Sequence, residues 1–247
     1  MIVVLSVRAI FVWLAVCVTA QGQSREVQQA QIRGFGQIEV SIHDDQLEIR
    51  RGAREWHVGV AQLPVFATDC DSPTERQKCE ARPSRSACVE CIHYPSPIAW
   101  DDANESLYFA VATGTSQNRP WIIFRYNLIG SQITRIMADY GAGFAFGTLS
   151  PSGRYLAYAA YASNGVCGTQ SFIEVLDLRS RHSAPVHYAT KNDDEIVDVQ
   201  SLRWANATAL DYSAEIHGEA DCRNAGPGSF SKRTVTGRIE VLRLGFH

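Results

Sequence analysis

P-S-G-R-Y-L-A-Y at 151–158 leads through a polar loop to F-I-E-V-L-D-L at 172–178. Pro151 and Gly153 favour a tight turn, because proline presets φ and glycine tolerates a positive φ. The runs that follow are rich in β-branched and aromatic residues, which is the composition of strands. R-I-E-V-L-R-L at 238–244 repeats the core of the second run. The chain therefore contains a strand unit that recurs, as in stacked or radially arranged β-folds.

Three such units can be aligned, each with strands separated by a polar turn and a longer loop. Their leucines mark equivalent positions: Leu107, Leu156 and Leu210 in the middle strand, and Leu128, Leu178 and Leu244 in the following one. These pairs are 21, 22 and 34 residues apart, so the third unit carries an insertion of about a dozen residues. The expected strands are 97–100, 107–112 and 121–128, then 146–149, 155–160 and 172–178, then 201–204, 209–214 and 238–244.

Further strands bring each unit towards four strands, the number in a propeller blade. Segments 132–137 and 185–190 follow the first two units, and 36–43, 46–51 and 56–61 alternate like an additional unit. We therefore predict an all-β fold, a β-propeller-like array of about four blades in a single domain over 21–247. The alternative is an irregular β-sandwich. The last unit lacks a fourth strand, and we expect the strand at 37–42 to supply it and close the ring.

The segments at 150–158 and 173–178 resemble the S-P-D-G-(K/R)-x-(I/L)-A-(F/Y) and I-(Y/W)-V-x-D-L repeat of TolB-type, or WD40-like, β-propellers. The same repeat occurs in the propeller domains of prolyl oligopeptidase relatives. The resemblance covers about 97–247 and is clear in the middle unit, where Ser152 replaces the usual aspartate. It implies a propeller fold and a periplasmic or secreted scaffold or binding role, and it supplies no catalytic residue.

The N-terminus has the pattern of a secretory signal peptide over 1–20. Arg8 precedes an unbroken apolar run at 9–18, and V-T-A at 18–20 is a small-residue cleavage pattern. The alternative is an uncleaved anchor. We expect cleavage after Ala20, no membrane span in the mature chain, and a periplasmic or secreted location.

Cleavage would remove one of the seven cysteines, and an even number in an exported chain favours disulfides. Cys167 and Cys222 lie 11 and 12 residues after equivalent leucines, in loops that neighbouring blades would bring together. We therefore expect a disulfide between them, which would hold the long third loop.

The other four cysteines crowd a polar insertion at about 68–95: Cys70, Cys79, Cys88 and Cys91. Two local disulfides are the first expectation. One alternative is a zinc site of Cys88, Cys91 and His93 with Cys70 or Cys79 as the fourth ligand. A redox-active C-x-x-C is the other, although no thioredoxin-like βαβ pattern surrounds it.

Catalytic motifs are weak in this sequence. There is no G-x-S-x-G, no H-E-x-x-H and no P-loop, so we expect no cofactor. His217, Glu219 and Asp221 cluster in the third loop and could act as acid and base or bind a cation. The first alternative function is therefore a small secreted, hydrolase-like enzyme with its site at 213–233. The second is a metal-stabilised interaction protein built on the cysteine cluster.

The leading hypothesis is an exported, non-catalytic β-propeller-like binding or scaffold protein whose partner is another exported or envelope protein. The formal net charge is −3 and no basic cluster occurs, which argues against nucleic acid and anionic membranes as partners. Loops on one face would bind the partner. These loops are 113–120, 163–171 and 217–233, with Trp121, Phe172 and Phe230 as aromatic anchors or, alternatively, as blade-to-blade packing residues.

Overall fold

The structure is a computed structural model of the chain. It describes residues 33–35, 38–43, 46–82, 87–114, 119–141, 143–165, 168–186, 194–217 and 232–246. The predicted signal peptide lies outside the described residues. None of the helices within these ranges is long and apolar enough to cross a membrane.

The described residues form four antiparallel sheets, which we call blades 1 to 4. Blade 1 consists of β1 (Arg33–Phe35), β2 (Ile38–His43), β3 (Gln46–Arg51) and β4 (Arg54–Gly59). Blade 2 consists of β5 (His93–Asp101), β6 (Ser106–Ala112), β7 (Arg119–Asn127) and β8 (Gln132–Gly141). Blade 3 consists of β9 (Gly143–Leu149), β10 (Tyr155–Gly165), β11 (Gly168–Asp177) and β12 (His182–Val186). Blade 4 consists of β13 (Asp194–Val197), β14 (Arg203–Trp204), β15 (Ala209–His217) and β16 (Lys232–Glu240).

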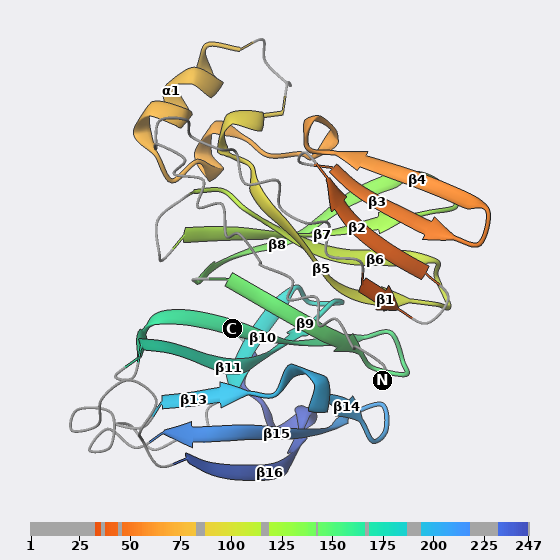
Figure 1. The fold of residues 1–247 in the computed structure, drawn as a ribbon, viewed down its shortest axis with the longest axis vertical. Coiled ribbons are helices and arrows are strands. Elements are labelled where there is room, and N and C mark those ends of the chain that lie inside the picture. The colour runs from red at the N-terminus through yellow and green to blue at the C-terminus, as the bar shows by residue number, and fades with distance from the viewer. Residues whose placement is uncertain are drawn as a thin grey trace, which may run out of the picture.

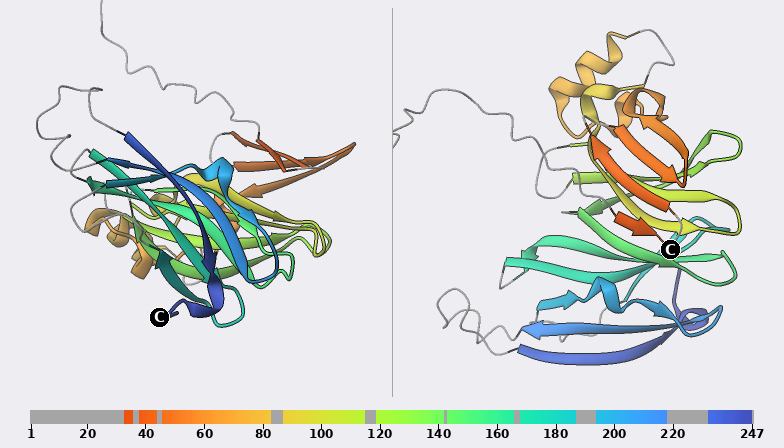
Figure 2. Two further views of the ribbon diagram at one scale, coloured as in Figure 1. Left: turned by 90° about the horizontal axis from the view of Figure 1, so that it is seen from below. Right: turned by 45° about the vertical axis from the view of Figure 1, so that its right-hand side comes forward.

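The blades follow one another in chain order, from blade 1 at one end of the molecule to blade 4 at the other (Figures 1 and 2). The all-β, propeller-like prediction is confirmed. The predicted ring closure is wrong, because β2 pairs with β1 and β3 inside blade 1 rather than with blade 4. In blade 4, β13 and β14 both pair with β15, so they share one strand position and leave three strand positions in the sheet.

The middle blades are buried on both faces. All seven residues of β6 are buried. Leu107, Phe109 and Val111 pack towards blade 1, whereas Tyr108, Ala110 and Ala112 pack towards blade 3. The strand β10 is divided in the same way between blades 2 and 4. Because both faces need apolar side chains, these strands are nearly continuous apolar runs rather than alternating ones.

The two end blades have polar outer faces. On blade 1, Arg50 forms ion pairs with Glu48 and Glu55, and the side chains of Arg50 and Glu55 are exposed. On blade 4, Asp211 and Arg238 form an ion pair with the shortest N···O separation at 2.6 Å. A polar face at each end of a stacked array keeps the terminal units in contact with water.

Backbone pairing confirms one of the two leucine alignments and corrects the other. Ser106↔Asn127, Tyr155↔Asp177 and Ala209↔Glu240 are the corresponding pairs in the last three blades. Leu107, Leu156 and Leu210, each the next residue, are therefore equivalent, as predicted. Val241 rather than Leu244 then occupies the position of Leu128 and Leu178. The structure thus shifts the repeated I-E-V-L by three residues in blade 4, where the strand ends at Glu240 and a 3-10 turn (η5, Val241–Arg243) follows.

Two motif residues of the repeat pair with each other. The guanidinium of Arg154 donates to the carboxylate of Asp177, with a shortest N···O distance of 2.7 Å, and the backbone N–H of Arg179 donates to the same carboxylate. Burial raises the pKa of Asp177, but the Arg154 and Arg179 hydrogen bonds outweigh it and the pKa is lowered. The motif Arg and Asp therefore fasten the hairpin and its turn, which is a structural role.

Candidate functional site

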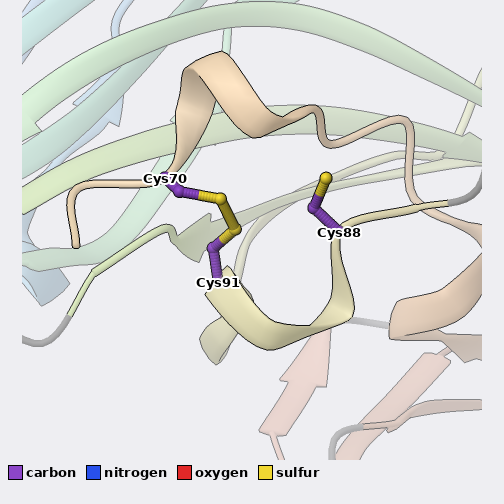
Figure 3. Close-up of side chains that lie close together, drawn as sticks. All are labelled: Cys70, Cys88 and Cys91. Atoms are coloured by element: carbon purple, nitrogen blue, oxygen red, sulfur yellow. A yellow bond between two sulfur atoms is a disulfide. The ribbon is translucent and has the colours of Figure 1, made fainter. Parts of the chain in front are cut away.

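The connection between β4 and β5 is a folded insertion. It contains three short 3-10 turns, η1 (Val60–Gln62), η2 (Ala67–Asp69) and η3 (Val89–Cys91), and the helix α1 (Pro73–Glu80). A disulfide joins Cys70 to Cys91, with Cα atoms 5.3 Å apart (Figure 3). A second joins Cys79 to Cys88, with Cα atoms 5.2 Å apart. All four cysteines are buried in the core that joins blades 1 and 2. The disulfides thus stand in the middle of an apolar cluster and not on an exposed tether.

The sequence analysis did not predict α1, although a signal for it is present. Ser72 is the N-cap and accepts a hydrogen bond from the N–H of Glu75, and Pro73 occupies the first turn. S-P-T-E at 72–75 has the spacing of a capping box with proline at the first helical position. The helix has no strong apolar stripe, because Cys79 is its single buried residue. Periodicity therefore could not reveal it.

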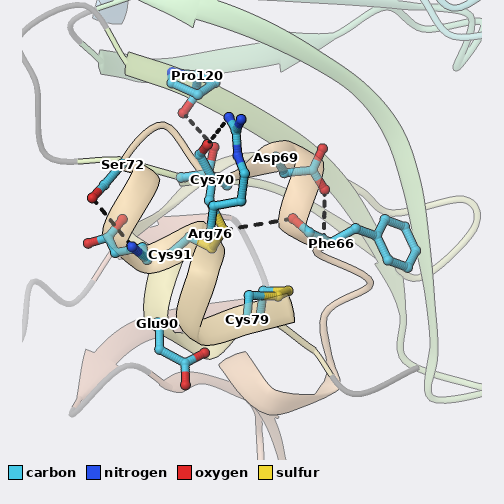
Figure 4. Close-up of a disulfide and its surroundings, with 12 residues drawn as sticks. Phe66, Asp69, Cys70, Ser72, Arg76, Cys79, Glu90, Cys91 and Pro120 are labelled. Carbon is cyan, nitrogen blue, oxygen red and sulfur yellow. Dashed lines mark hydrogen bonds between the residues drawn. A yellow bond between two sulfur atoms is a disulfide. The ribbon is translucent and has the colours of Figure 1, made fainter. Parts of the chain in front are cut away.

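The insertion is fastened to blade 2. The carboxylate of Asp69 accepts two hydrogen bonds from the Arg135 guanidinium of β8, at 2.7 and 2.8 Å. The N–H of Asp71 donates to the carbonyl of Thr113, just after β6. Within the insertion, Arg76 donates to the carbonyl of Cys70, and Asp69 accepts from the N–H of Phe66 (Figure 4).

This docking covers the start of the first predicted binding loop. Thr113 is fully buried, and a Cβ added at Gly114 would lie 2.6 Å from the Cβ of Asp71. Residues 113 and 114 therefore contact the insertion rather than a partner. Residues 115–118 of the same loop lie outside the described residues, as does part of the loop at 163–171 and most of that at 217–233.

The aromatic anchors named from the sequence are packing residues where they are described. Trp121 is buried in the core between blades 2 and 3, and Phe172 packs against the same core. Phe230 lies outside the described residues. Cys167, Cys222, Glu219 and Asp221 also lie outside them, and so does the side chain of His217. The Cys167–Cys222 disulfide and the hydrolase-like site at 213–233 remain predictions.

The structure brings some of the candidate metal ligands together and separates another from them. The Sγ atoms of Cys70, Cys88 and Cys91 lie within 4.8 Å of one another. His93 does not belong to this group, since its Nε2 lies 3.4 Å from Oε1 of Glu75 on α1. Of the predicted zinc ligands, the structure therefore brings together Cys88, Cys91 and the candidate fourth ligand Cys70, and it leaves His93 out.

The site that the sequence analysis missed is an open groove between blades 1 and 2. Its volume is about 710 Å³. Its walls come from β4 and the segment after it, and from β7 and the start of β8. The lining residues are Trp56, His57, Gln62, Pro64, Tyr126, Ser131, Gln132 and Ile133.

A second hollow of about 490 Å³ lies beside the same tryptophan. It is lined by Arg54, Glu55, Trp56, Glu105, Leu128, Ile129 and Ser131. Ile129 is 77 % exposed, the largest exposed fraction among the described large hydrophobic residues. Trp56 and Ser131 line both hollows, so the two hollows adjoin at the indole, and we refer to them together as the groove.

The groove runs along a strand edge. Arg54, Glu55, Trp56 and His57 are consecutive in β4 and line one or both hollows, and consecutive side chains of a strand point to opposite faces. The groove can reach side chains on both faces of blade 1 only along the edge of β4. β4 is the last strand of its sheet and β8 is the last strand of blade 2. Within the described residues, the groove therefore separates two edge strands.

Some backbone N–H and C=O groups of β4 point outward from this edge. The turn between β3 and β4 has Gly52 and Ala53 at its centre, with φ of 60° at Gly52, so Arg51 and Arg54 flank a two-residue hairpin. Antiparallel pairs alternate between bonded and non-bonded. Counting from this hairpin, Trp56 and Val58 bond to β3, whereas Glu55 and His57 direct their N–H and C=O groups outward.

The face of blade 1 opposite Trp56 carries a cluster of titratable side chains. Oxygen and nitrogen atoms of Glu48, Glu55 and His57 lie within 4.8 Å of one another. Hydrogen bonds from the carboxyl of Glu55 and from the hydroxyl of Ser41 are the largest causes that hold the pKa of Glu48 at about 2. Glu48 is thus ionised at neutral pH.

No protein-family model matches this chain, and no curated protein matches it. The TolB-type assignment therefore stays a prediction. Solved structures that resemble it include hydrazine synthase of Kuenenia stuttgartiensis (11 % identity, TM-score 0.42, 81 % of this chain and 47 % of that chain). Oligogalacturonate lyase in complex with manganese has 11 % identity and a TM-score of 0.45, over 81 % of this chain and 50 % of that one.

The β-propeller domain of the Trilobed protease from Pyrococcus furiosus has 10 % identity and a TM-score of 0.39, over 82 % of this chain and 57 % of that one. The chain thus spans about half the length of the structures it matches. What those proteins bind or catalyse is a property of those proteins. The chain is similar to propeller proteins of known structure.

Proposed function

We propose that this protein is an exported, non-catalytic binding module that holds an extended segment of a partner protein in the groove between blades 1 and 2. The partner is another exported or envelope protein. The observation that carries the proposal is the outward edge of β4, whose free backbone groups at Glu55 and His57 border a groove with Trp56 along it.

An extended peptide fits this arrangement because it can add a strand to an exposed sheet edge. Main-chain hydrogen bonds then supply affinity, and pockets for alternate side chains supply specificity. Trp56 offers a large, rigid apolar surface on the groove, of the kind that dominates binding energy at interfaces. The hollows on both sides of the indole are suited to side chains on the two faces of such a peptide.

Export is supported by two observations. The N-terminal 20 residues have the pattern of a signal peptide. The paired cysteines of the insertion are typical of an oxidising compartment.

The test is selection of peptides from a displayed random library on the mature protein, followed by affinity measurement on variants. Trp56→Ala should weaken a selected peptide by at least about tenfold, as expected for an aromatic anchor. His57→Pro removes an outward N–H without breaking the β3–β4 ladder, and it should abolish binding. His57→Ala keeps that N–H and is the matched control, which should bind within a few-fold of the wild type.

Two results would contradict this proposal. Selected peptides could bind equally well to the wild type and to both Trp56→Ala and His57→Pro, which would place the binding surface elsewhere. Alternatively, the library could yield no binder while the folded protein hydrolyses a model substrate. Circular dichroism of each variant establishes that the β-fold is retained.

A further inference from the structure

The four cysteines of the insertion form a compact, water-excluded sulfur cluster. Cys70, Cys88 and Cys91 have Sγ atoms within 4.8 Å of one another, and Cys79 is bonded to Cys88. Their exposed fractions are 1 %, 2 %, 0 % and 6 % in that order. Figure 3 shows Cys88 beside the Cys70–Cys91 disulfide. The two disulfides are thus neighbours and not independent links.

We propose that these four side chains bind one zinc ion when both disulfides are reduced. In a tetrahedral zinc–thiolate site the Zn–S distance is about 2.3 Å, which sets sulfurs about 3.8 Å apart. The sulfurs of Cys70, Cys88 and Cys91 already lie within 4.8 Å of one another, and Cys79 is bonded to Cys88. Small side-chain rotations would therefore convert the cluster into a closed site with four sulfur ligands.

The backbone that carries the sulfurs suits a metal site. Cys88 and Cys91 stand at the two ends of η3, where the N–H of Cys91 donates to the carbonyl of Cys88 at 3.1 Å. A C-x-x-C spacing is typical of the ligand pairs in structural zinc sites. Cys70 directly follows η2 and Cys79 lies in the last turn of α1. All four ligands are thus held by short, hydrogen-bonded elements.

The outer contacts also favour a fixed site. The guanidinium of Arg76 donates to the carbonyl of Cys70 at 2.9 Å, and the N–H of Cys88 donates to the carbonyl of Val65 at 3.1 Å. His93 is turned to Glu75 and Glu90 is paired with Arg82, so neither competes for the metal position. Thiolate selects zinc over hard cations such as Mg²⁺ and Ca²⁺.

The chemistry balances without a change in the oxidation state of the metal. A dithiol reductant gives two electrons and two protons to each disulfide and becomes a disulfide itself. Zinc then replaces the thiol protons, and up to four protons per ion are released to solvent. Zinc affinity should therefore increase as the pH rises.

The consequence concerns the insertion before it is oxidised. The two disulfides cross-link the insertion internally, Cys70 to Cys91 and Cys79 to Cys88. With the sulfurs reduced, zinc would cross-link the same four positions. The redox state of the compartment would then select which link holds α1 in place.

The experiment compares the oxidised chain with the chain reduced by a dithiol, desalted under argon and mixed with zinc. Elemental analysis after gel filtration should give one zinc per reduced chain and none per oxidised chain. The zinc-loaded chain should then resist alkylation at Cys70, Cys79, Cys88 and Cys91 in peptide mass spectrometry. Cys167 and Cys222 should react as they do without zinc.

Variants give a second readout. Cys91→Ser should lose the zinc, whereas Cys222→Ser is the matched control and should keep it. The alkylation map on the wild-type chain decides the outcome even where Cys91→Ser fails to fold. The proposal is overturned by a reduced, folded chain that binds no zinc, by zinc retained in Cys91→Ser, or by zinc that protects Cys167 or Cys222 instead.

Discussion

Asp69 and Arg135 join the insertion to blade 2 through two parallel hydrogen bonds, at 2.7 and 2.8 Å. Their side chains are 12 % and 28 % exposed, so water screens the pair only partly. Planar, bidentate pairs of this kind are stronger than single neutral hydrogen bonds. The pair therefore fixes the position of the insertion over the end of β6.

Replacing Arg135 by methionine should destabilise the protein by roughly 1 to 3 kcal/mol, because a charge-assisted pair is lost and Asp69 keeps its charge. Urea unfolding followed by tryptophan fluorescence measures this change. The matched control is Arg243→Met, at an exposed position in η5, which should change the free energy of unfolding by less than about 0.5 kcal/mol. Equal effects of the two substitutions would show that the pair does not stabilise the insertion.

Removing either disulfide should lower stability, and the Cys70–Cys91 link should matter more. It spans 21 residues, whereas Cys79–Cys88 spans 9. In the chain-entropy picture the two losses are about 3.3 and about 2.6 kcal/mol. The double variants Cys70→Ser/Cys91→Ser and Cys79→Ser/Cys88→Ser are compared by denaturant unfolding under non-reducing conditions. A larger loss for the shorter loop would contradict the entropic account.

Gly147 of β9 should tolerate no side chain. A Cβ there would lie 2.3 Å from the carbonyl oxygen of Ala157 and 2.9 Å from the Cβ of Tyr158. Because the first of these atoms is backbone, Gly147→Ala should cost about 1 to 3 kcal/mol or more. Gly59→Ala is the control, since nothing lies within 4 Å of its added Cβ. Thermal unfolding of both variants gives the comparison, and similar midpoints would show that β9 can move away.

The stabilising effect of Asp177 should depend on pH. Its pKa is lowered in the folded protein, so its contribution is complete above its ordinary pKa of about 3.9 and is lost as the pH falls through the lower folded value. Asp177→Asn should therefore cost roughly 1 to 2 kcal/mol at pH 7, a value reduced by the exposure of Arg154. The difference from the wild type should shrink at pH 3 and below. A difference independent of pH would assign the effect to packing.

The local sequence was sufficient to predict the strands of the middle blades and one set of equivalent positions in the repeat. Leu107, Leu156 and Leu210 are each the second residue of their strand, and the turn residues before each strand mark where it begins. Leu244 was misaligned because the letters I-E-V-L match in two registers, and only backbone pairing shows that Glu240 stands opposite Ala209. The repeated I-E-V-L sequence alone does not indicate where β16 ends.

The groove could not be predicted because it depends on two strands that are distant in the sequence. Trp56 reads as an ordinary strand residue, and Gln132 as the start of another strand. Only the packing of blade 1 beside blade 2 turns their edges towards a shared space. The disulfide pairs within the insertion likewise depend on the path of α1, which the sequence periodicity did not reveal.

The three apolar cores between successive blades have unequal protection against unfolding. The core between blades 1 and 2 contains all four cysteines of the insertion. Among the described residues, the core between blades 3 and 4 contains no cysteine, and it is closed by Val241 and, at its margin, by Phe246. In an array whose units contact only their neighbours, the end with the fewest restraints opens first. In a chain whose predicted Cys167–Cys222 disulfide is reduced, blade 4 should therefore exchange its amide hydrogens through a local opening that leaves blades 1 and 2 folded, and unfolding would begin at the C-terminal end.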